Sequence, residues 1–142
     1  MTVGAILGNK GREVISITAD QSVGEAVAVL ATRRVGAVPV MDGADVVGIF
    51  SERDVIHAIA EFGAAAMARK VGDTMTSPAI TVGPNDPVIG ALSLMSRRRI
   101  RHLPVIEDGR VIGLVSIGDL VKYRIDRIEA DAEAMRNYIQ SV

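Results

Sequence analysis

Two short segments of the chain carry residue types that could together hold a sugar and an anion. Each consists of glycine, two apolar residues, serine, two variable residues and aspartate, at 48–54 and again at 113–119. We expect a strand to pass into a helix there, and the free N–H groups and dipole of a helix N-terminus favour an anion. An aspartate on the first helical turn could accept hydrogen bonds from a vicinal diol. Serine, N–H groups and aspartate together would suit a ribose phosphate.

Helix capping is a simpler explanation of the same residues. A serine at the N-cap and an acidic residue three positions later form a capping box, in which Asp54 only reaches back to Ser51. For one segment taken alone, capping is the favoured interpretation. The recurrence of the pattern beside apolar strands in both segments favours a ligand site.

A basic cluster that ends in Arg101 and His102 supplies candidate partners for a phosphate. The arginines at 97–99 include residues that fit the end of a helix, where basic groups complement the dipole. Arg101 and His102 are expected to begin a buried strand, in which a charge is costly unless it meets an anion. The equivalent residues of the other copy are Gly36 and Ala37, so the copies differ at positions that would face a ligand.

Both segments belong to a repeat that covers most of the chain. An offset of 65 residues aligns 15–56 with 80–121 without a gap and gives eleven identities in forty-two positions. Paired Pro, Gly, Ser and Asp at one offset are harder to attribute to an apolar composition than paired Val, Ile or Ala. Two copies can pack about a pseudo-twofold axis and form two related clefts between them.

Each repeat is predicted as a strand, a helix, a hairpin and a second helix. In the first repeat these are a strand at 13–17, a helix that Ser22 and Glu25 cap and Gly36 ends, a hairpin across Asp42 and Gly43, and a helix from Ser51 to about Phe62. In the second repeat they are a strand at 79–82, a helix opened by 84–87, a hairpin turn at 107–109 and a helix capped by Ser116. Since a half of about 65 residues is marginal for an independent core, we expect the halves to share one core.

The last helix is predicted to run past its counterpart in the first repeat. Its apolar residues are spaced 4-3-4-3-4, which is a heptad seam flanked by charged residues. The seam consists of Val121, Ile125, Ile128, Ala132, Met135 and Ile139. Two interpretations remain open: the helix covers its own domain, or it pairs with another copy of the chain.

Composition narrows the functions that are available to the 142 residues. A net charge of −1 disfavours a dedicated nucleic-acid binder, and 3% aromatic residues without Trp disfavour a stacking platform. The absence of Cys excludes disulfides and a Cys-based metal site. There is no signal-peptide pattern and no uncharged apolar run near the roughly 18 residues of a membrane span, so we expect a cytoplasmic protein without a membrane contact.

Other chemistry finds little support in the sequence. Neither His57 nor His102 has metal-ligand spacing to acidic residues, so we predict no metal site. No phosphate-binding glycine loop and no nucleophile–base pair is visible, so we predict no catalytic residues. The alternatives that stay open are an enzyme acting on a nucleotide with dispersed catalytic residues, and a structural dimerisation protein without a ligand.

The doubled pattern over about 3–123 resembles a cystathionine-β-synthase (CBS) domain pair, or Bateman module, of the stand-alone bacterial type. The resemblance implies an α+β fold, with tandem βαββα repeats about a pseudo-twofold axis and an extended C-terminal helix. One module would span 1–142, with repeats at about 3–62 and 71–123 and the extension at about 124–140. It implies a regulatory module in signal transduction that needs no cofactor and is no enzyme. It also implies a homodimer that acts on an effector protein outside this chain.

The resemblance also implies that adenine nucleotides bind in two clefts between the repeats. In such pairs the aspartate holds the ribose, serine and nearby basic groups hold phosphate, and strand residues of the other copy contact the base. One cleft would use Ile49, Phe50, Ser51, Arg53, Asp54, Ile80, Thr81, Arg101 and His102. The other would use Ile15, Ser16, Gly36, Ala37, Leu114, Val115, Ser116, Gly118 and Asp119.

The two clefts are not expected to be equivalent. The Asp54 cleft gathers Arg53, Arg101 and His102, which could neutralise phosphate, whereas the Asp119 cleft has Gly118 in place of Arg53. We therefore expect a nucleotide such as AMP, ADP or ATP to prefer the Asp54 cleft. NAD is the next candidate and S-adenosylmethionine a third. The other cleft would stay empty, or take a nucleoside or part of a dinucleotide.

Overall fold

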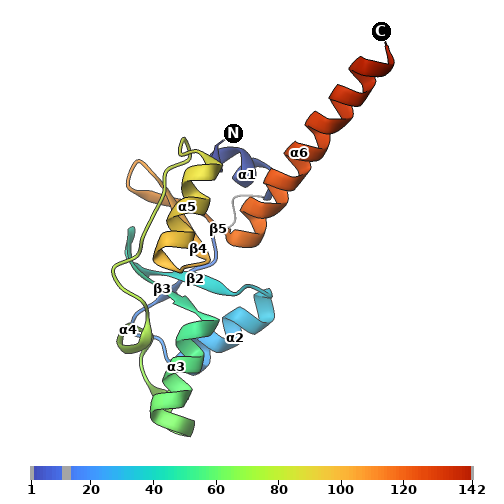
Figure 1. Cartoon of the computed structure of the whole chain (residues 1–142). Helices are drawn as coiled ribbons and strands as arrows, with labels where there is room; N and C mark the ends of the chain where they lie inside the picture. Colours follow the sequence, from blue (N-terminus) through green and yellow to red (C-terminus); the bar gives the residue numbers. More distant parts are fainter. Residues whose placement is uncertain (1, 11–13, 142) are drawn as a thin grey trace.

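The computed structural model describes residues 2–10 and 14–141 and confirms an α+β fold built from two related halves (Figure 1). The first sheet contains β1 (Ile17–Thr18), β2 (Ala37–Asp42) and β3 (Asp45–Ser51), and the second contains β4 (His102–Glu107) and β5 (Arg110–Ser116). The helices are α1 (Val3–Lys10), α2 (Val23–Arg33), α3 (Glu52–Phe62), a 3₁₀ helix (Gly63–Ala68), α4 (Val71–Thr74), α5 (Val88–Arg98) and α6 (Ile117–Gln140).

The two hairpins are closely similar parts of the halves. Both are antiparallel, and Ala37 lies opposite Ser51 just as the equivalent His102 lies opposite Ser116. Both ladders also shift register at equivalent points, near the middle of β2 and of β4. The repeat offset therefore extends to the pairing of individual backbone groups, and each hairpin ends at the serine that starts the next helix.

The first strand of each half is shorter than its alternating pattern predicts. β1 has two residues, parallel to β2, and 14–16 form no regular element, while residue 13 lies outside the described residues. The strand predicted at 79–82 is reduced to one parallel bridge between Val82 and Val105. Upstream of it, Thr76 instead pairs with Ile49 of the first half through two backbone hydrogen bonds of 2.9 Å. The segment therefore contacts both sheets, with Thr76 paired to β3 and Val82 paired to β4.

The first helix of each repeat ends at an arginine rather than at a glycine. Arg34, with φ of 55°, is the C-cap of α2, and its equivalent Arg99, also with φ of 55°, is the C-cap of α5. The prediction that Gly36 ends α2 is therefore wrong. The backbone N–H of Arg34 donates to the carbonyl of Leu30, which satisfies a helix-end acceptor in the way a glycine cap does.

The halves have two hydrophobic cores, so the prediction of one shared core is wrong. Each core is completed by the segment that precedes the other half: α1 adds Val3 and Leu7 to the second core, and Val71 of α4 joins the first. Backbone hydrogen bonds hold both exchanged segments, from Val3 N to Asp86 O at 2.9 Å and from Val71 N to Gln21 O at 2.8 Å. The exchange compensates for the small size of each half.

Two paired glycines make room for the exchanged segments. A Cβ at Gly48 would lie 2.7 Å from the Sδ of Met75 and 2.8 Å from the carbonyl oxygen of Thr76. A Cβ at the equivalent Gly113 would meet the side chain of Leu7 just as closely. These hairpin glycines are therefore required by a close approach of another segment, and not by the turn itself.

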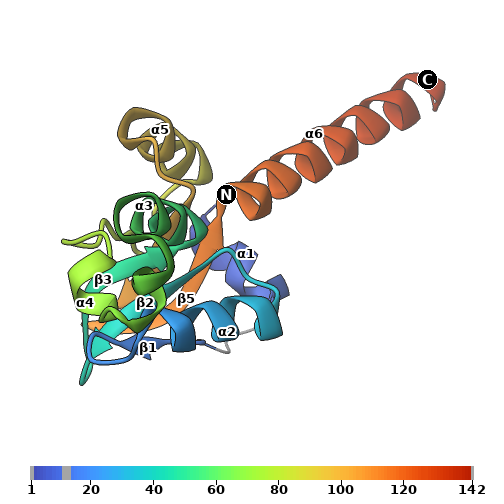
Figure 2. The same cartoon turned by 90° about the horizontal axis from the view of Figure 1, so that it is seen from below.

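Helix α6 projects well beyond the two halves (Figures 1 and 2). Leu120 in its first turn is fully buried, whereas every residue from 125 to 140 is exposed. The interpretation in which this helix covers its own domain is therefore wrong for its distal part. Among the described residues, no helix combines the length and the apolar character needed to cross a membrane.

Candidate functional site

A cavity lies between the two halves, beside the start of α3. Its lining comes from the end of β3 and the first turn of α3 in one half, and from the segments before β4 in the other. The lining residues are Gly36, Ile49, Ser51, Glu52, Arg53, Asp54, Thr76, Pro78, Ala79, Ile80, Ile100, Arg101 and His102. The structure thus brings together most of the residues that the sequence assigns to the Asp54 cleft.

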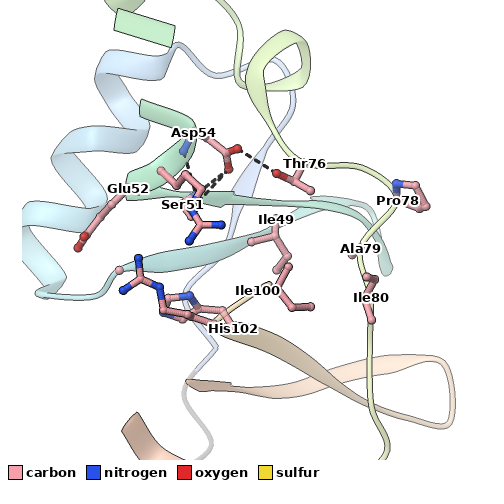
Figure 3. A pocket seen from close by; sticks show the side chains of 13 residues that line it. Ile49, Ser51, Glu52, Asp54, Thr76, Pro78, Ala79, Ile80, Ile100 and His102 are labelled. Atoms are coloured by element: carbon pink, nitrogen blue, oxygen red, sulfur yellow. Dashed lines mark hydrogen bonds between the residues drawn. The ribbon is translucent and has the colours of Figure 1, made fainter. Parts of the chain in front are cut away.

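Asp54 is held firmly at the edge of this cavity (Figure 3). Its Oδ2 accepts hydrogen bonds from the backbone N–H of Ser51 at 2.8 Å and from the hydroxyl of Ser51 at 3.1 Å. Its Oδ1 accepts one from the hydroxyl of Thr76 at 2.9 Å. Among the residues that the structure describes, it is the one charged side chain that is buried, with 9% exposure. Capping is thus a real role of Asp54, and a diol that reached Oδ1 would compete with Thr76.

Arg53 links the two halves next to Asp54. Its Nη1 donates to the carbonyl oxygen of Arg99 at 3.0 Å, at the C-terminal end of α5. A cation at that position complements the negative end of a helix dipole. A guanidinium has five N–H donors, so this bond leaves others that could meet a phosphate. The structure therefore gives Arg53 a structural contact in addition to the phosphate role predicted for it.

The first strand of the second hairpin begins differently from the prediction. Arg101 is exposed and precedes β4, so it does not begin a buried strand and its charge carries no burial cost. His102 is the first residue of β4 and is partly buried. A Cβ at Gly36 would lie 3.3 Å from the Nε2 of His102 and 3.4 Å from Oε1 of Glu52. Gly36, which is predicted for the other cleft, therefore lies in this one, where it leaves space for two polar side chains.

The apolar part of the lining lies on one side of the cavity. Figure 3 shows Ile49, Ile80 and Ile100 together with Ala79, while Glu52 lies away from them. A flat apolar ring fits such a surface, since ligand pockets are lined mainly by apolar groups with a few polar contacts. The cavity can therefore offer an apolar contact, a carboxylate and basic groups to a single ligand.

Two residues predicted for this cleft do not line it. Phe50 is fully buried in the core of the first half, because successive side chains of a strand point to opposite faces and those of Ile49 and Ser51 face the cavity. Thr81 is exposed and lies outside the lining. In the other half, the side chain of Val115 is buried in the second core for the same reason as Phe50.

Sequence reasoning missed several lining residues. These are Glu52, Thr76, Pro78, Ala79 and Ile100. Glu52 directly follows the capping serine, so its position on the first turn of α3 could have been recognised. Thr76 has no comparable local signal, because its hydrogen bond to Asp54 joins residues that are 22 positions apart.

The second capping box repeats the local geometry of the first. The backbone N–H of Ser116 donates to Oδ2 of Asp119 at 2.9 Å, and the N–H of Asp119 donates to the Ser116 hydroxyl at 3.1 Å. The other residues predicted for that cleft are absent from the lining of the cavity around Asp54. These are Ile15, Ser16, Ala37, Leu114, Val115 and Gly118, and their assembly into a second ligand site stays a prediction. In the part of the chain that the structure describes, no cluster of His, Asp and Glu could hold a metal ion.

Two related halves with exchanged segments and a cavity between them define a tandem-repeat α+β module. The CBS domain family model matches residues 7–61 and 71–126, and the chain belongs to this family. It is 35% identical over 98% of its length to the mitochondrial CBS domain-containing protein CBSX3 of Arabidopsis thaliana, of which it covers 72%. A CBS-domain protein of Agrobacterium tumefaciens superposes with a TM-score of 0.84 at 40% identity, over 87% of this chain and 99% of that one.

Two other similar structures contain adenosine compounds. The CBS domain pair of protein MJ0100, in complex with 5′-methylthioadenosine and S-adenosyl-L-methionine, is 26% identical with a TM-score of 0.80, over 89% of this chain and 98% of that one. A CBS domain protein of Pyrobaculum aerophilum complexed with AMP is 28% identical with a TM-score of 0.74, over 84% and 89%. Proteins of this fold therefore include binders of ligands that share an adenosine group.

Proposed function

We propose that this chain is a regulatory module that binds an adenine nucleotide, AMP, ADP or ATP, in the cavity around Asp54. The observation that carries the proposal is the cavity itself, which combines a carboxylate, an apolar side and basic groups drawn from both halves. The ligands of the similar structures support the adenosine part, since AMP, methylthioadenosine and S-adenosylmethionine all contain it. NAD also contains adenosine and is the second candidate.

In the proposed arrangement each part of the nucleotide meets the group that suits it. The adenine contacts the apolar side that Ile80 and Ile100 line. The ribose diol donates to Asp54 and displaces the hydroxyl of Thr76 from Oδ1. The phosphate lies toward Arg101, the free donors of Arg53 and the N-terminus of α3, where the helix dipole favours an anion.

The proposed mechanism is regulatory rather than catalytic. A ligand that contacts both halves enriches the conformer in which the halves fit it best. The cavity is lined by both halves, and hydrogen bonds from Thr76 and Arg53 join them beside it. A ligand that alters these contacts would therefore alter how the two halves pack against each other. The effector protein and the homodimer are parts of the proposal that the family resemblance implies, and the cytoplasmic location is expected from the sequence.

A nucleotide panel tests the proposal directly. AMP, ATP, NAD and S-adenosylmethionine are each added to the full chain in a thermal-unfolding assay, with GMP as the control for the base. A ligand at 100 times its dissociation constant should raise the midpoint by roughly 6–10 °C, from about 2.7 kcal/mol of added stability. We expect AMP or ATP to do so and GMP to have little effect. No shift with any adenine compound at millimolar concentration would contradict the proposal.

A further inference from the structure

The distal part of α6 presents an apolar stripe that no described part of the chain covers. Ile125, Ile128, Met135 and Ile139 are between 49% and 65% exposed, and their spacing places them on one face of the helix. Figures 1 and 2 show this part of α6 clear of both halves from two directions. A helix in water gains most of its stability by packing an apolar face, so this stripe calls for a partner.

The width of the stripe indicates what kind of partner fits. A helix that packs on a globular core has a broad apolar face, whereas the residues of α6 follow the narrow 3.5-residue period of a coiled-coil seam. A seam of this kind is complementary to another helix with the same period. We propose that α6 pairs in parallel with α6 of a second copy of the chain.

The charges beside the seam favour the parallel orientation. With Ile125, Ala132 and Ile139 at position a, Arg124 and Asp131 occupy position g. Glu129 and Arg136 then occupy position e. In a parallel pair each g residue faces the next e residue of the other helix. Arg124 would therefore face Glu129 of the partner subunit, and Asp131 would face Arg136 of the partner subunit. Arg136 also donates to Glu133 within its own helix at 2.7 Å and keeps further N–H donors.

An antiparallel pair cannot combine full burial of the seam with favourable charges. To bury the whole seam, Val121 must lie opposite Ile139 of the partner subunit. Position e then faces position e, and position g faces position g. Glu129 therefore lies against the partner's Glu129, and Asp131 lies against the partner's Asp131. A register shifted by one heptad relieves these contacts, but it removes two seam residues of each helix from the interface. These are Met135 and Ile139 for a shift in one direction, and Val121 and Ile125 for a shift in the other.

Cysteine cross-linking tests the pairing, because the chain has no cysteine of its own. Ala132→Cys lies on the seam and Ala130→Cys lies on the outer face, so the two form a matched pair. Under mild oxidation, we expect a covalent dimer from Ala132→Cys and at least about ten times less from Ala130→Cys, since a disulfide needs Cα atoms within about 7 Å. Ile139→Cys should also cross-link, whereas in the antiparallel pair that buries the whole seam its two copies would be roughly 27 Å apart.

Two further measurements complete the test. Adding Ile128→Asp to the Ile139→Cys variant should abolish most of the cross-linking, while adding Ala130→Asp should not. Light scattering of the unmodified chain should give twice the mass of one 15.0 kDa chain. A monomer, equal cross-linking at 130 and 132, or a dimer in which Ile139→Cys does not cross-link would each overturn the proposal. None of these outcomes depends on whether the cavity binds a nucleotide.

Discussion

Asp54 and Asp119 make the same capping contact but have different surroundings. Each accepts a hydrogen bond from the backbone N–H of the serine that starts its helix. Asp54 also accepts a hydrogen bond from the hydroxyl of Thr76, and Arg53 lies beside it. Next to Asp119 the corresponding neighbour is Gly118. The repeated residues thus serve the fold, and the residues around them distinguish the two sites.

The repeated serine and aspartate are weaker evidence for a ligand in the structure than they are in the sequence. In the sequence, recurrence of the serine and aspartate favours a binding site over a plain cap. In the structure, both helices use the pair as a capping box, so the fold alone is sufficient to explain the recurrence. The stronger support for a ligand comes from what differs, which is the polar and apolar lining that surrounds Asp54.

The largest expected effect separates the two aspartates by their contribution to AMP binding. Asp54→Ala should weaken AMP binding by about 10-fold to 100-fold, because hydrogen bonds to a charged group contribute roughly 1.5–3 kcal/mol. Asp119→Ala removes the same kind of cap from the other half and should change AMP affinity less than about 2-fold. Isothermal titration calorimetry measures both constants. Equal losses in the two variants would show that the two sites do not differ as proposed.

The features that the sequence predicted well depend on near neighbours in the chain. The caps at Ser51 and Ser116 and the turn at Gly109 follow from residues within four positions of one another. The bond between Thr76 and Asp54, and the exchange of α1 and α4 between the halves, join distant residues through packing that leaves no local pattern. The buried direction of Phe50 could have been derived, since alternation places it opposite Ile49 and Ser51.

The next effect concerns the two glycines that admit the exchanged segments. Gly48→Ala would bring a methyl group against the backbone oxygen of Thr76, which cannot move without disturbing the pairing with Ile49. Gly113→Ala would meet the side chain of Leu7, which can change its rotamer. Since overpacking costs about 1–3 kcal/mol, we expect Gly48→Ala to lie near the upper end and Gly113→Ala near the lower end. Urea unfolding measures both.

Gly8→Ala is a suitable control for these two variants. Nothing lies within 4 Å of a Cβ at this helical position, so the change should be neutral or should stabilise the protein by about 0.5–1 kcal/mol. If Gly113→Ala cost as much as Gly48→Ala, the halves would be equally rigid around their exchanged segments. The difference between a backbone contact at Gly48 and a side-chain contact at Gly113 would then have no consequence for stability.

A smaller effect is expected from removing the Thr76 hydroxyl, which donates a hydrogen bond to Asp54. Thr76→Val leaves Oδ1 of a buried carboxylate without this partner, which should lower the free energy of unfolding by about 1–2 kcal/mol. AMP should bind the variant at least as tightly, because the ribose no longer has to displace a hydroxyl. Thr74→Val, in the same segment, is the control. A loss of AMP affinity in Thr76→Val would indicate that Thr76 contacts the nucleotide itself.

The smallest effect is expected from replacing one residue of the first half by its counterpart in the second. Arg53→Gly copies Gly118 into the Asp54 cleft and removes an exposed cation that also bonds to the carbonyl oxygen of Arg99. Because exposed ion pairs contribute about 0.2–1 kcal/mol, AMP affinity should fall by about 2-fold to 5-fold. Adenosine, which has no phosphate, separates the two roles of Arg53 in calorimetry. If the variant binds adenosine with unchanged affinity, Arg53 acts on the phosphate. If its affinity for adenosine falls as much as its affinity for AMP, Arg53 acts by joining α3 to the end of α5. In that case the basic character of this cleft depends on Arg101 and His102.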